Sequence, residues 1–322
     1  MPVDPKLQAI LDAEKALGHP PVEQLTPQQV RSGVAQHIAS FQPIPDHSGV
    51  AKEARLIVQD GHSIPARIYT PPGDAPFPIA VLFHSGGWVT GSLDTHEPYC
   101  RAFATAAKAV VVSVDYRLAP EHRFPAALED CTDAALWVLG HTAELKGTPE
   151  QVFIGGDSAG GTLATTVALL LRDRKVLPPL AGQILLYPAT AYYDPPTASY
   201  LENSEGYGLT RKGMIWYWDL YLNDRSESTN PLVSPLLAPD LADLPPAFIV
   251  TAQYDVLRDE GDAYANRLAK AGVEVTHLYV KGMNHGFAAS AKEFPYLDQA
   301  HTVLQSVAEW VAAIVQQQSS SR

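Results

Sequence analysis

A serine between glycines is the residue best suited to chemistry in this sequence. Ser158 stands at the centre of Gly156-Asp157-Ser158-Ala159-Gly160, directly after the strand-like run QVFIG and directly before the apolar run GTLATTVALLL. A strand that turns at once into a helix holds the serine in a strained backbone conformation, and the glycines let neighbouring backbone come close. This context predicts a nucleophile. The alternative is a serine that only caps the helix.

A serine hydroxyl is a poor nucleophile at neutral pH, so it needs a histidine to take its proton and a carboxylate to orient that histidine. Where a serine sits on such a turn, the carboxylate and then the histidine follow it in the chain. Asp255 ends the strand-like run AFIVTAQYD, and His285 follows the strand-like run THLYV. We therefore expect His285 to be the general base and Asp255 to orient it.

Other acidic residues near these positions receive structural interpretations. Asp259 and Glu260 follow Asp255 closely, and we assign them to the first turn of a helix, where the helix dipole favours negative charge. Asp157, the variable position of the serine turn, is expected to anchor that turn through local hydrogen bonds.

Ester or amide cleavage also needs hydrogen-bond donors aimed at the developing oxyanion, each contributing about a hundred- to a thousandfold in rate. One donor should be the amide of Ala159, which follows the nucleophile. The others should come from the run His84-Ser85-Gly86-Gly87-Trp88, in which paired glycines let backbone amides face a substrate.

The elements that must position these residues alternate along the chain. Strand-like and helix-like runs follow one another from Ala54 to the C-terminus, which predicts an α/β fold with a mostly parallel sheet and helices on both faces. The first 45 residues read as amphipathic helices, and residues 192–239 interrupt the alternation with a segment rich in Tyr, Trp, Pro and Asn. We predict a core of residues 46–191 and 240–322, with residues 1–45 and 192–239 forming a helical cap.

Composition excludes several classes of function. The 322 residues carry a formal net charge of −12, which disfavours nucleic acid and anionic membrane surfaces as partners. The longest apolar runs fall far short of the roughly 20 residues that span a bilayer, so stable membrane insertion is not expected. Two cysteines and a start without a signal-peptide pattern favour a cytoplasmic location. The eleven histidines show no H-E-x-x-H or similar spacing, so no metal is expected.

Aromatic residues in and near the expected cap allow two interpretations. Trp88 beside the glycine pair, and Trp216, Tyr217, Trp218 and Tyr221 in the insertion, could line an acyl pocket or simply pack the cap. No site role is assigned to them.

Several separated motifs together resemble one family. HSGGW, DYRLAPEHRFPAALED, GDSAGG and HGF occur in an order and spacing similar to those of the hormone-sensitive-lipase-like esterases, the bacterial family IV lipolytic enzymes. The resemblance implies an eight-stranded α/β-hydrolase core with a helical cap, no cofactor, and hydrolysis of short- to medium-chain carboxylic esters. By motif position it also implies Ser158, Asp255 and His285 as the catalytic triad and the amides of Gly86, Gly87 and Ala159 as the oxyanion hole.

The sequence departs from the family pattern at two points and leaves other activities open. Ser85 replaces the first glycine of the usual His-Gly-Gly-Gly, and Val256 replaces a proline after Asp255. A lactonase, an amidase or an acyl-peptide hydrolase could use the same triad. A non-catalytic ligand receptor of this fold is less consistent with the sequence, because His285 is present. The expected partner is a small-molecule ester, and the resemblance allows a homodimer through the edge of the sheet.

Overall fold

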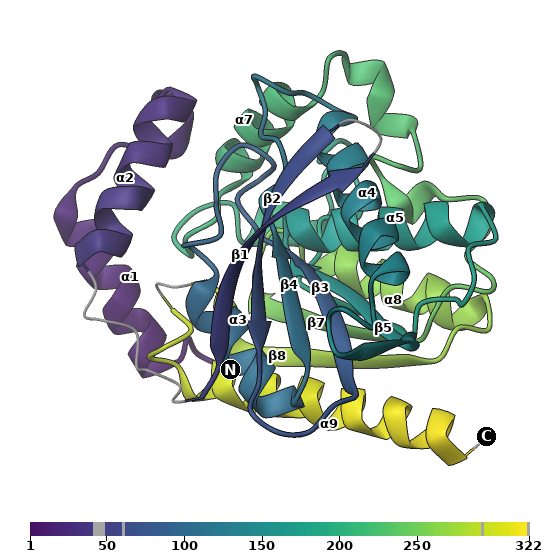
Figure 1. The fold of residues 1–322 in the computed structure, drawn as a ribbon. Helices are drawn as coiled ribbons and strands as arrows, with labels where there is room; N and C mark the ends of the chain where they lie inside the picture. The colour runs from purple at the N-terminus through teal and green to yellow at the C-terminus, as the bar shows by residue number, and fades with distance from the viewer. Residues whose placement is uncertain (41–48, 60–61, 291–292, 321–322) are drawn as a thin grey trace.

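The computed structural model of the protein describes residues 1–40, 49–59, 62–290 and 293–320. A single eight-stranded sheet runs through it in the order β1-β2-β4-β3-β5-β6-β7-β8 (Figure 1). Strands β3 to β8 are parallel, while β2 is antiparallel to both of its neighbours. The strands are β1 (Ala51–Gln59), β2 (His62–Thr70), β3 (Phe77–Phe83), β4 (Val110–Val114), β5 (Gly147–Asp157), β6 (Gly182–Leu186), β7 (Ala247–Tyr254) and β8 (Val275–Asn284). The predicted α/β-hydrolase architecture is confirmed.

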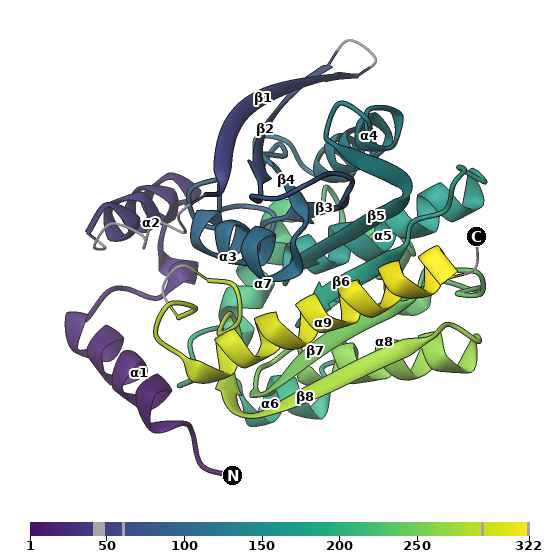
Figure 2. The same ribbon diagram turned by 60° about the horizontal axis from the view of Figure 1, so that its bottom comes forward.

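Helices cover both faces of the sheet (Figures 1 and 2). On one face lie α3 (Glu97–Ala107) and α9 (Asp298–Ser320), and on the other lie α4 (Ala126–Gly140), α5 (Ala159–Asp173) and α8 (Arg258–Lys270). The central strands are apolar on both sides because each contributes alternate residues to the two cores. In β3, Val81 and Phe83 join the core under α4 and α5, whereas Ala80 and Leu82 join the core under α3 and α9.

Two further sets of helices stand outside these layers. The N-terminal set is α1 (Pro5–Leu17), η1 (Val22–Gln24) and α2 (Pro27–Ser40), and the set inserted between β6 and β7 is α6 (Ala198–Glu202), α7 (Arg211–Tyr221), η2 (Arg225–Thr229) and η3 (Pro235–Leu237). The two sets meet where η1 packs against α7. The predicted cap segments thus contain helices, although residues 41–45 lie outside the described residues. The division of the chain into core and cap at the stated boundaries stays a prediction.

Arg31 ties α2 to the core. Its guanidinium donates to the carbonyls of Val89 (2.8 Å) and Ala119 (2.7 Å) and pairs with Glu121 (2.7 Å). This anchor fixes the N-terminal helices beside the loop that follows β3. In the described part of the chain, no helix combines the length and the apolar character needed to cross a membrane.

Candidate active site

The turn at Ser158 is held by contacts between backbone atoms. β5 ends at Asp157 and α5 begins at Ala159, and Ser158 between them has φ 55° and ψ −121°, a strained conformation for a residue with a side chain. A Cβ on Gly160 would lie only 2.0 Å from the carbonyl oxygen of Phe83, and one on Gly156 would lie 2.5 Å from the same oxygen. The glycines therefore let β3 and the turn pack directly, and this contact fixes the path of the backbone at the serine.

Ser158, His285 and Asp255 form one hydrogen-bonded line. His285 Nε2 lies 2.9 Å from Ser158 Oγ, and His285 Nδ1 lies 2.7 Å from Asp255 Oδ2. Asp255 directly follows β7 and His285 directly follows β8, so both stand at the carboxyl ends of parallel strands, where open α/β sheets place their functional residues. The structure brings together the three side chains that the sequence singled out.

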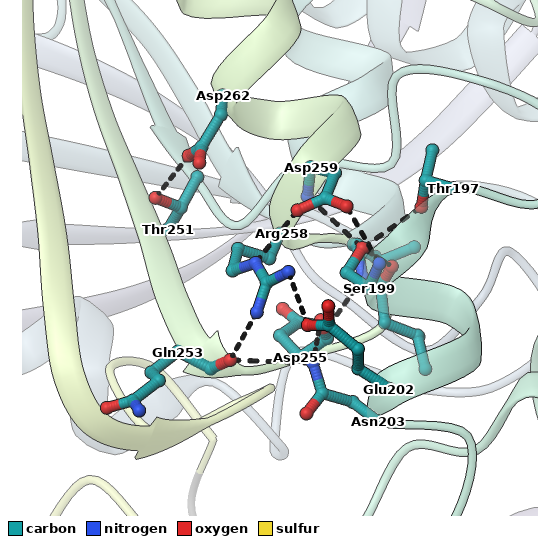
Figure 3. A network of polar contacts seen from close by, with 12 residues as sticks. Thr197, Ser199, Glu202, Asn203, Thr251, Gln253, Asp255, Arg258, Asp259 and Asp262 are labelled. Atoms are coloured by element: carbon teal, nitrogen blue, oxygen red, sulfur yellow. Dashed lines mark hydrogen bonds and ion pairs between the residues drawn. The ribbon is translucent and has the colours of Figure 1, made fainter. Parts of the chain in front are cut away.

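The Asp255 carboxylate is buried and held from several sides. Its Oδ1 accepts a hydrogen bond from the Leu257 amide (2.9 Å), which leaves Oδ2 for His285. Asn203 of the insertion donates to the Asp255 backbone carbonyl (3.0 Å). Figure 3 shows this contact within a wider network in which Arg258 links the end of β7 to Glu202. The insertion thus contributes directly to the position of the carboxylate.

The electrostatics around His285 favour its protonated form. Burial lowers the pKa of the imidazole, but the Asp255 carboxylate, through its charge and its hydrogen bond, raises it. The charges of Asp157 and Glu293 act in the same direction, and the net pKa lies above the ordinary histidine value. Such a group can accept a proton from a serine hydroxyl and hold it beside the carboxylate.

The loop after β3 presents backbone amides beside the serine turn. Gly86 and Gly87 both have positive φ values, 119° and 58°. A Cβ on Gly86 would lie 2.2 Å from the Thr90 carbonyl oxygen, so only glycine fits this path. Ala159 is the first residue of α5, and its amide has no partner within the helix. The geometry is that of a loop and a helix start that can both donate to an oxyanion.

Buried side chains pack against the loop that carries Gly86 and Gly87. His84 stacks on Tyr116 (4.2 Å between ring centroids), and the Tyr116 hydroxyl donates to the His84 carbonyl (2.7 Å). Burial, with a smaller contribution from nearby His96, lowers the pKa of His84 to about 3, so this imidazole stays neutral. The Ser85 amide lies 3.3 Å from His96 Nε2.

The interpretation of Asp157 needs correction. Its partner is not local: Asp157 Oδ1 lies 3.0 Å from Nε2 of His96, a residue between β3 and α3. Burial alone would raise the pKa of Asp157, but the charge and hydrogen bond of His96 lower it below the ordinary value. Because His96 also contacts Ser85, the pair links the serine turn to the loop of Gly86 and Gly87.

The assignment of the neighbouring acids to a helix is confirmed, because Asp259 and Glu260 lie in the first turn of α8. Glu260 is nevertheless buried, and its Oε1 accepts hydrogen bonds from the amides of Thr190 (2.8 Å) and Ala191 (3.2 Å). Burial raises the pKa of this carboxyl well above its usual range. Glu260 therefore fastens the loop after β6 to the helix that follows Asp255.

The aromatic residues near the site pack in two different places. Trp88 and Trp218 are fully buried, with ring centroids 4.4 Å apart, and Trp88 stacks on Tyr221 at 4.3 Å. For these three the packing interpretation holds. Tyr217 differs, because its ring lies against Gly87: a Cβ there would be 2.2 Å from Tyr217 Cδ1.

A pocket of about 960 Å³ lies between the N-terminal helices and the loop that carries Gly86.

In the described part of the chain, no group of three or more His, Cys, Asp or Glu side chains is placed so that it could hold a metal ion. The chemistry available at the site is that of the serine, the histidine, the carboxylate and the backbone amides.

Sequence reasoning missed two contributors to the site, His96 and Asn203, and it named Tyr217 without assigning it a site role. None belongs to a motif that marks chemistry, and each reaches the site from a loop or from the insertion. The only usable signal was the HSGG variant, since a serine at position 85 implies a polar neighbour for its hydroxyl. That neighbour is His96, whose Nε2 lies 3.2 Å from Ser85 Oγ.

Comparisons with known proteins agree with this geometry. A family model described as the alpha/beta hydrolase fold matches residues 80–289. The carboxylesterase NlhH of Mycobacterium tuberculosis is 42% identical over 253 residues, which cover 77% of this chain and 79% of that protein. An arylesterase of Saccharolobus solfataricus is 34% identical over 293 residues, covering 91% of this chain and 94% of that protein. The solved structure of a hyperthermophilic esterase from the archaeon Pyrobaculum calidifontis superposes with a TM-score of 0.92 at 36% identity, covering 98% of this chain and 99% of the other.

Proposed function

The chain belongs to the hormone-sensitive-lipase-like branch of the α/β-hydrolase family and is a carboxylic ester hydrolase, and from this premise we propose that it works through a covalent acyl-enzyme on Ser158. In this proposal His285 is the general base and acid, and Asp255 orients it. The amides of Gly86, Gly87 and Ala159 form the oxyanion hole.

The first half of the reaction forms the acyl-enzyme. His285 Nε2 takes the proton from Ser158 Oγ while Oγ bonds to the ester carbonyl carbon, and the carbonyl oxygen becomes an oxyanion among the three amides. The bond from carbon to the alcohol oxygen then breaks. The alcohol leaves with the proton that His285 held, and the acyl group remains on Ser158.

The second half regenerates the enzyme. A water molecule gives a proton to His285 Nε2 and bonds to the acyl carbon, and the oxyanion forms again at the same amides. When the bond to Ser158 Oγ breaks, His285 returns the proton to the serine and the carboxylic acid is released. No cofactor is needed for either half.

One observation carries the proposal: the unbroken line from Ser158 Oγ through His285 to Asp255, at 2.9 and 2.7 Å. Both distances lie within the range required of a nucleophile, its base and the group that orients the base. The strained backbone at Ser158 supports the same assignment.

The direct test is hydrolysis of p-nitrophenyl butyrate by the parent and by Ser158→Ala, with a chelator present. We expect the parent to turn over and the variant to lose about 10⁶ in kcat, the loss seen when a serine nucleophile is removed. Ser306→Ala on α9, whose hydroxyl donates to the Thr302 carbonyl of its own helix far from Ser158 in the fold, is the matched control and should retain activity. Equal rates for parent and Ser158→Ala would refute the nucleophile.

We also propose a cytoplasmic location and a small-molecule ester as the only required partner. Cys100 and Cys131 support the location, because both are free thiols and disulfides are rare in cytosolic proteins. A homodimer through an edge strand of the sheet stays open to a gel-filtration measurement, in which a mass of one chain would exclude it.

A further inference from the structure

The proposed oxyanion hole is built from two separate segments of the chain. Ala159 belongs to the serine turn between β5 and α5, whereas Gly86 and Gly87 belong to the loop after β3. An oxyanion is stabilised by both segments only when their amides lie about 2.7 to 3.1 Å from the same point. A contact that fixes the loop relative to the serine turn therefore bears directly on the reaction.

Hydrogen bonds within the loop set the directions of its amides. In a planar trans peptide, the C=O group and the N–H group that follows it point in opposite directions. The Ser85 carbonyl accepts a hydrogen bond from His84 Nδ1 (2.8 Å). The Gly86 carbonyl accepts one from the Thr90 amide (2.9 Å). The amides of Gly86 and Gly87 therefore point away from these partners, but these bonds do not set the distance between the loop and the serine turn.

His96 joins the loop to the serine turn. This residue directly precedes α3, and only 6% of its surface is exposed. Its Nε2 lies 3.0 Å from Asp157 Oδ1, and it also lies 3.2 Å from Ser85 Oγ and 3.3 Å from the Ser85 amide nitrogen. Asp157 directly precedes Ser158, and Ser85 directly precedes Gly86. One ring nitrogen thus contacts the neighbour of the nucleophile and the neighbour of the first oxyanion glycine.

The orientation of the His96 ring is fixed from its other side. The Thr95 hydroxyl donates its hydrogen to the Ser92 carbonyl (2.7 Å), so toward His96 Nδ1, 2.7 Å away, it can only accept. Nδ1 therefore carries a hydrogen, and this bond holds the ring with Nε2 toward Asp157. The His96 carbonyl accepts from the Cys100 amide (2.9 Å) in the first turn of α3. Both the backbone and the ring of His96 are thus held by bonds that do not involve the oxyanion loop.

The Asp157 side of this contact is a buried carboxylate. Burial raises the pKa of Asp157, but the charge and hydrogen bond of His96, together with a hydrogen bond from Ser85, bring it below the ordinary value. The carboxylate is therefore ionised at neutral pH and attracts both residues. Removing one partner of such a buried contact leaves a charge without compensation, which costs far more than the loss of a surface contact. Asp157, His96 and Ser85 thus form one connected unit.

We propose that His96 is a positioning residue for the oxyanion hole, which holds the loop of Gly86 at the distance from Ala159 that a single oxyanion requires. It neither touches the substrate nor transfers a proton. The inference rests on the proposed acyl-enzyme mechanism and extends it to a residue outside the triad. The hydroxyl contact belongs to this chain's departure from the family pattern, because a glycine in place of Ser85 would have no side chain to offer His96.

Two amide side chains separate the roles of the two ring nitrogens. A glutamine amide reaches nearly as far as Nε2, whereas an asparagine amide reaches only as far as Nδ1. His96→Asn should therefore keep the contact with Thr95 and lose the contacts with Asp157 and Ser85. Its kcat for p-nitrophenyl butyrate should fall about tenfold to a hundredfold, less than the loss of a whole oxyanion donor causes. KM should stay nearly constant, because the oxyanion exists only in the transition state. His96→Gln should keep most of the parent's kcat.

A transition-state analogue gives a second readout that a purely structural role would not move. Butyl trifluoromethyl ketone adds to the serine hydroxyl and places a negative oxygen where the oxyanion forms. Its inhibition constant should rise in His96→Asn by the same factor by which kcat falls. The matched control is His277→Asn, which also removes a contact between an imidazole and a carboxylate, that of Asp262 (3.2 Å) between β8 and α8. It should leave kcat and the inhibition constant unchanged.

A double variant tests whether His96 acts through Ser85. Ser85→Ala removes the hydroxyl and keeps the backbone amide. If the two residues belong to one unit, Ser85→Ala combined with His96→Asn should be no slower than His96→Asn alone. Losses of kcat that multiply in the double variant would mean that the two residues act independently, and they would overturn the proposal.

The remaining outcomes separate this inference from the proposed function. Equal losses of kcat in His96→Asn and His96→Gln, with equal decreases in Tm, would show that His96 only stabilises the fold. If Ser158→Ala is inactive while His96→Asn keeps the parent's kcat and inhibition constant, this inference alone is wrong. If Ser158→Ala is as active as the parent, the proposed function itself fails, and the oxyanion hole with it.

Discussion

The nucleophile and its base are held in two different ways. The Ser158 turn is fixed by backbone: β5 enters it, α5 leaves it, and Gly160 packs directly on the Phe83 carbonyl. Asp255 and His285 stand on loops, and their mutual position depends on side-chain hydrogen bonds. We call the Ser158 turn the backbone half of the site, and Asp255 with His285 the side-chain half. Activity should therefore be lost when the backbone contacts of the Ser158 turn are altered. In the side-chain half the loss of activity should depend on which hydrogen bond is removed.

The largest loss of activity is expected when the charge of the Asp255 carboxylate is removed. Asp255→Asn keeps the size of the side chain but removes the carboxylate that fixes the His285 tautomer, so kcat should fall by about 10⁴. The measurement is steady-state hydrolysis of p-nitrophenyl butyrate. Asp259→Asn is the control. A larger loss of kcat in Asp259→Asn than in Asp255→Asn would show that Asp259, and not Asp255, orients His285.

The backbone half is tested by adding one methyl group. In Gly160→Ala the new Cβ would lie 2.0 Å from the Phe83 oxygen, so β3 or the turn must shift, at a stability cost of about 1 to 3 kcal/mol or more. We expect a lower Tm and at least a hundredfold loss of kcat, because displacement of the turn by about 1 Å is enough for that. Gly140→Ala, at the end of α4 where nothing lies within 4 Å of the new Cβ, should leave kcat unchanged and should not lower Tm.

A smaller effect is expected where the insertion supports Asp255. Asn203→Ala removes the hydrogen bond to the Asp255 carbonyl without touching the carboxylate, so kcat should fall about tenfold or less, equivalent to about 1.4 kcal/mol. Asn223→Ala is the matched control, because Asn223 also joins the insertion to a backbone carbonyl, that of Phe124 (2.7 Å). Equal losses in both variants would mean that general loosening, and not support of Asp255, explains the effect.

The charge environment of His285 predicts a pH profile. His285 acts as a base only when neutral, and its pKa is raised above the ordinary value, so the acidic limb of kcat/KM should lie above the usual histidine pKa of about 6.5. A profile from pH 4 to 9 measures it. A limb at or below the ordinary value would contradict the proposed influence of Asp255.

The smallest effect concerns stability at Glu260. The pKa of its carboxyl group is raised in the folded state, so on raising the pH the unfolded chain loses this proton before the folded protein does. The free energy of unfolding therefore falls as the pH rises from the ordinary carboxyl pKa toward the pKa in the folded state. Glu260→Gln keeps an acceptor for the Thr190 and Ala191 amides but cannot ionise. Its Tm relative to the parent should increase by a few degrees between pH 5 and pH 8.

The control for this stability effect is Glu309→Gln, which changes an exposed carboxyl on α9. Its Tm difference from the parent should stay constant over the same pH interval. A constant difference for Glu260→Gln as well would show that Glu260 is ionised in the folded protein.

The backbone half of the site was more predictable from sequence than the side-chain half. The alternation of strands and helices and the run around Ser158 are local patterns, so they predict the sheet, its two covered faces and the serine turn. Asp255 and His285 were found because each directly follows a strand. His96 and Asn203 could not be found in this way, because their contacts join segments far apart in the chain and leave no periodic trace. For Tyr217 the sequence left two interpretations open, pocket lining and cap packing. Asp157 shows the limit most clearly, since its local role was wrong and its partner His96 lies in another loop.

The most direct test of the central claim is covalent trapping. Diethyl p-nitrophenyl phosphate should phosphorylate Ser158 Oγ, with the release of one p-nitrophenolate per active chain, and intact-mass and peptide analysis should place one diethylphosphoryl group on the peptide containing Ser158. We expect this adduct in the parent, much slower formation in His285→Ala, and none in Ser158→Ala. A stable adduct on another residue, or full activity of the parent after quantitative modification of Ser158, would contradict the account.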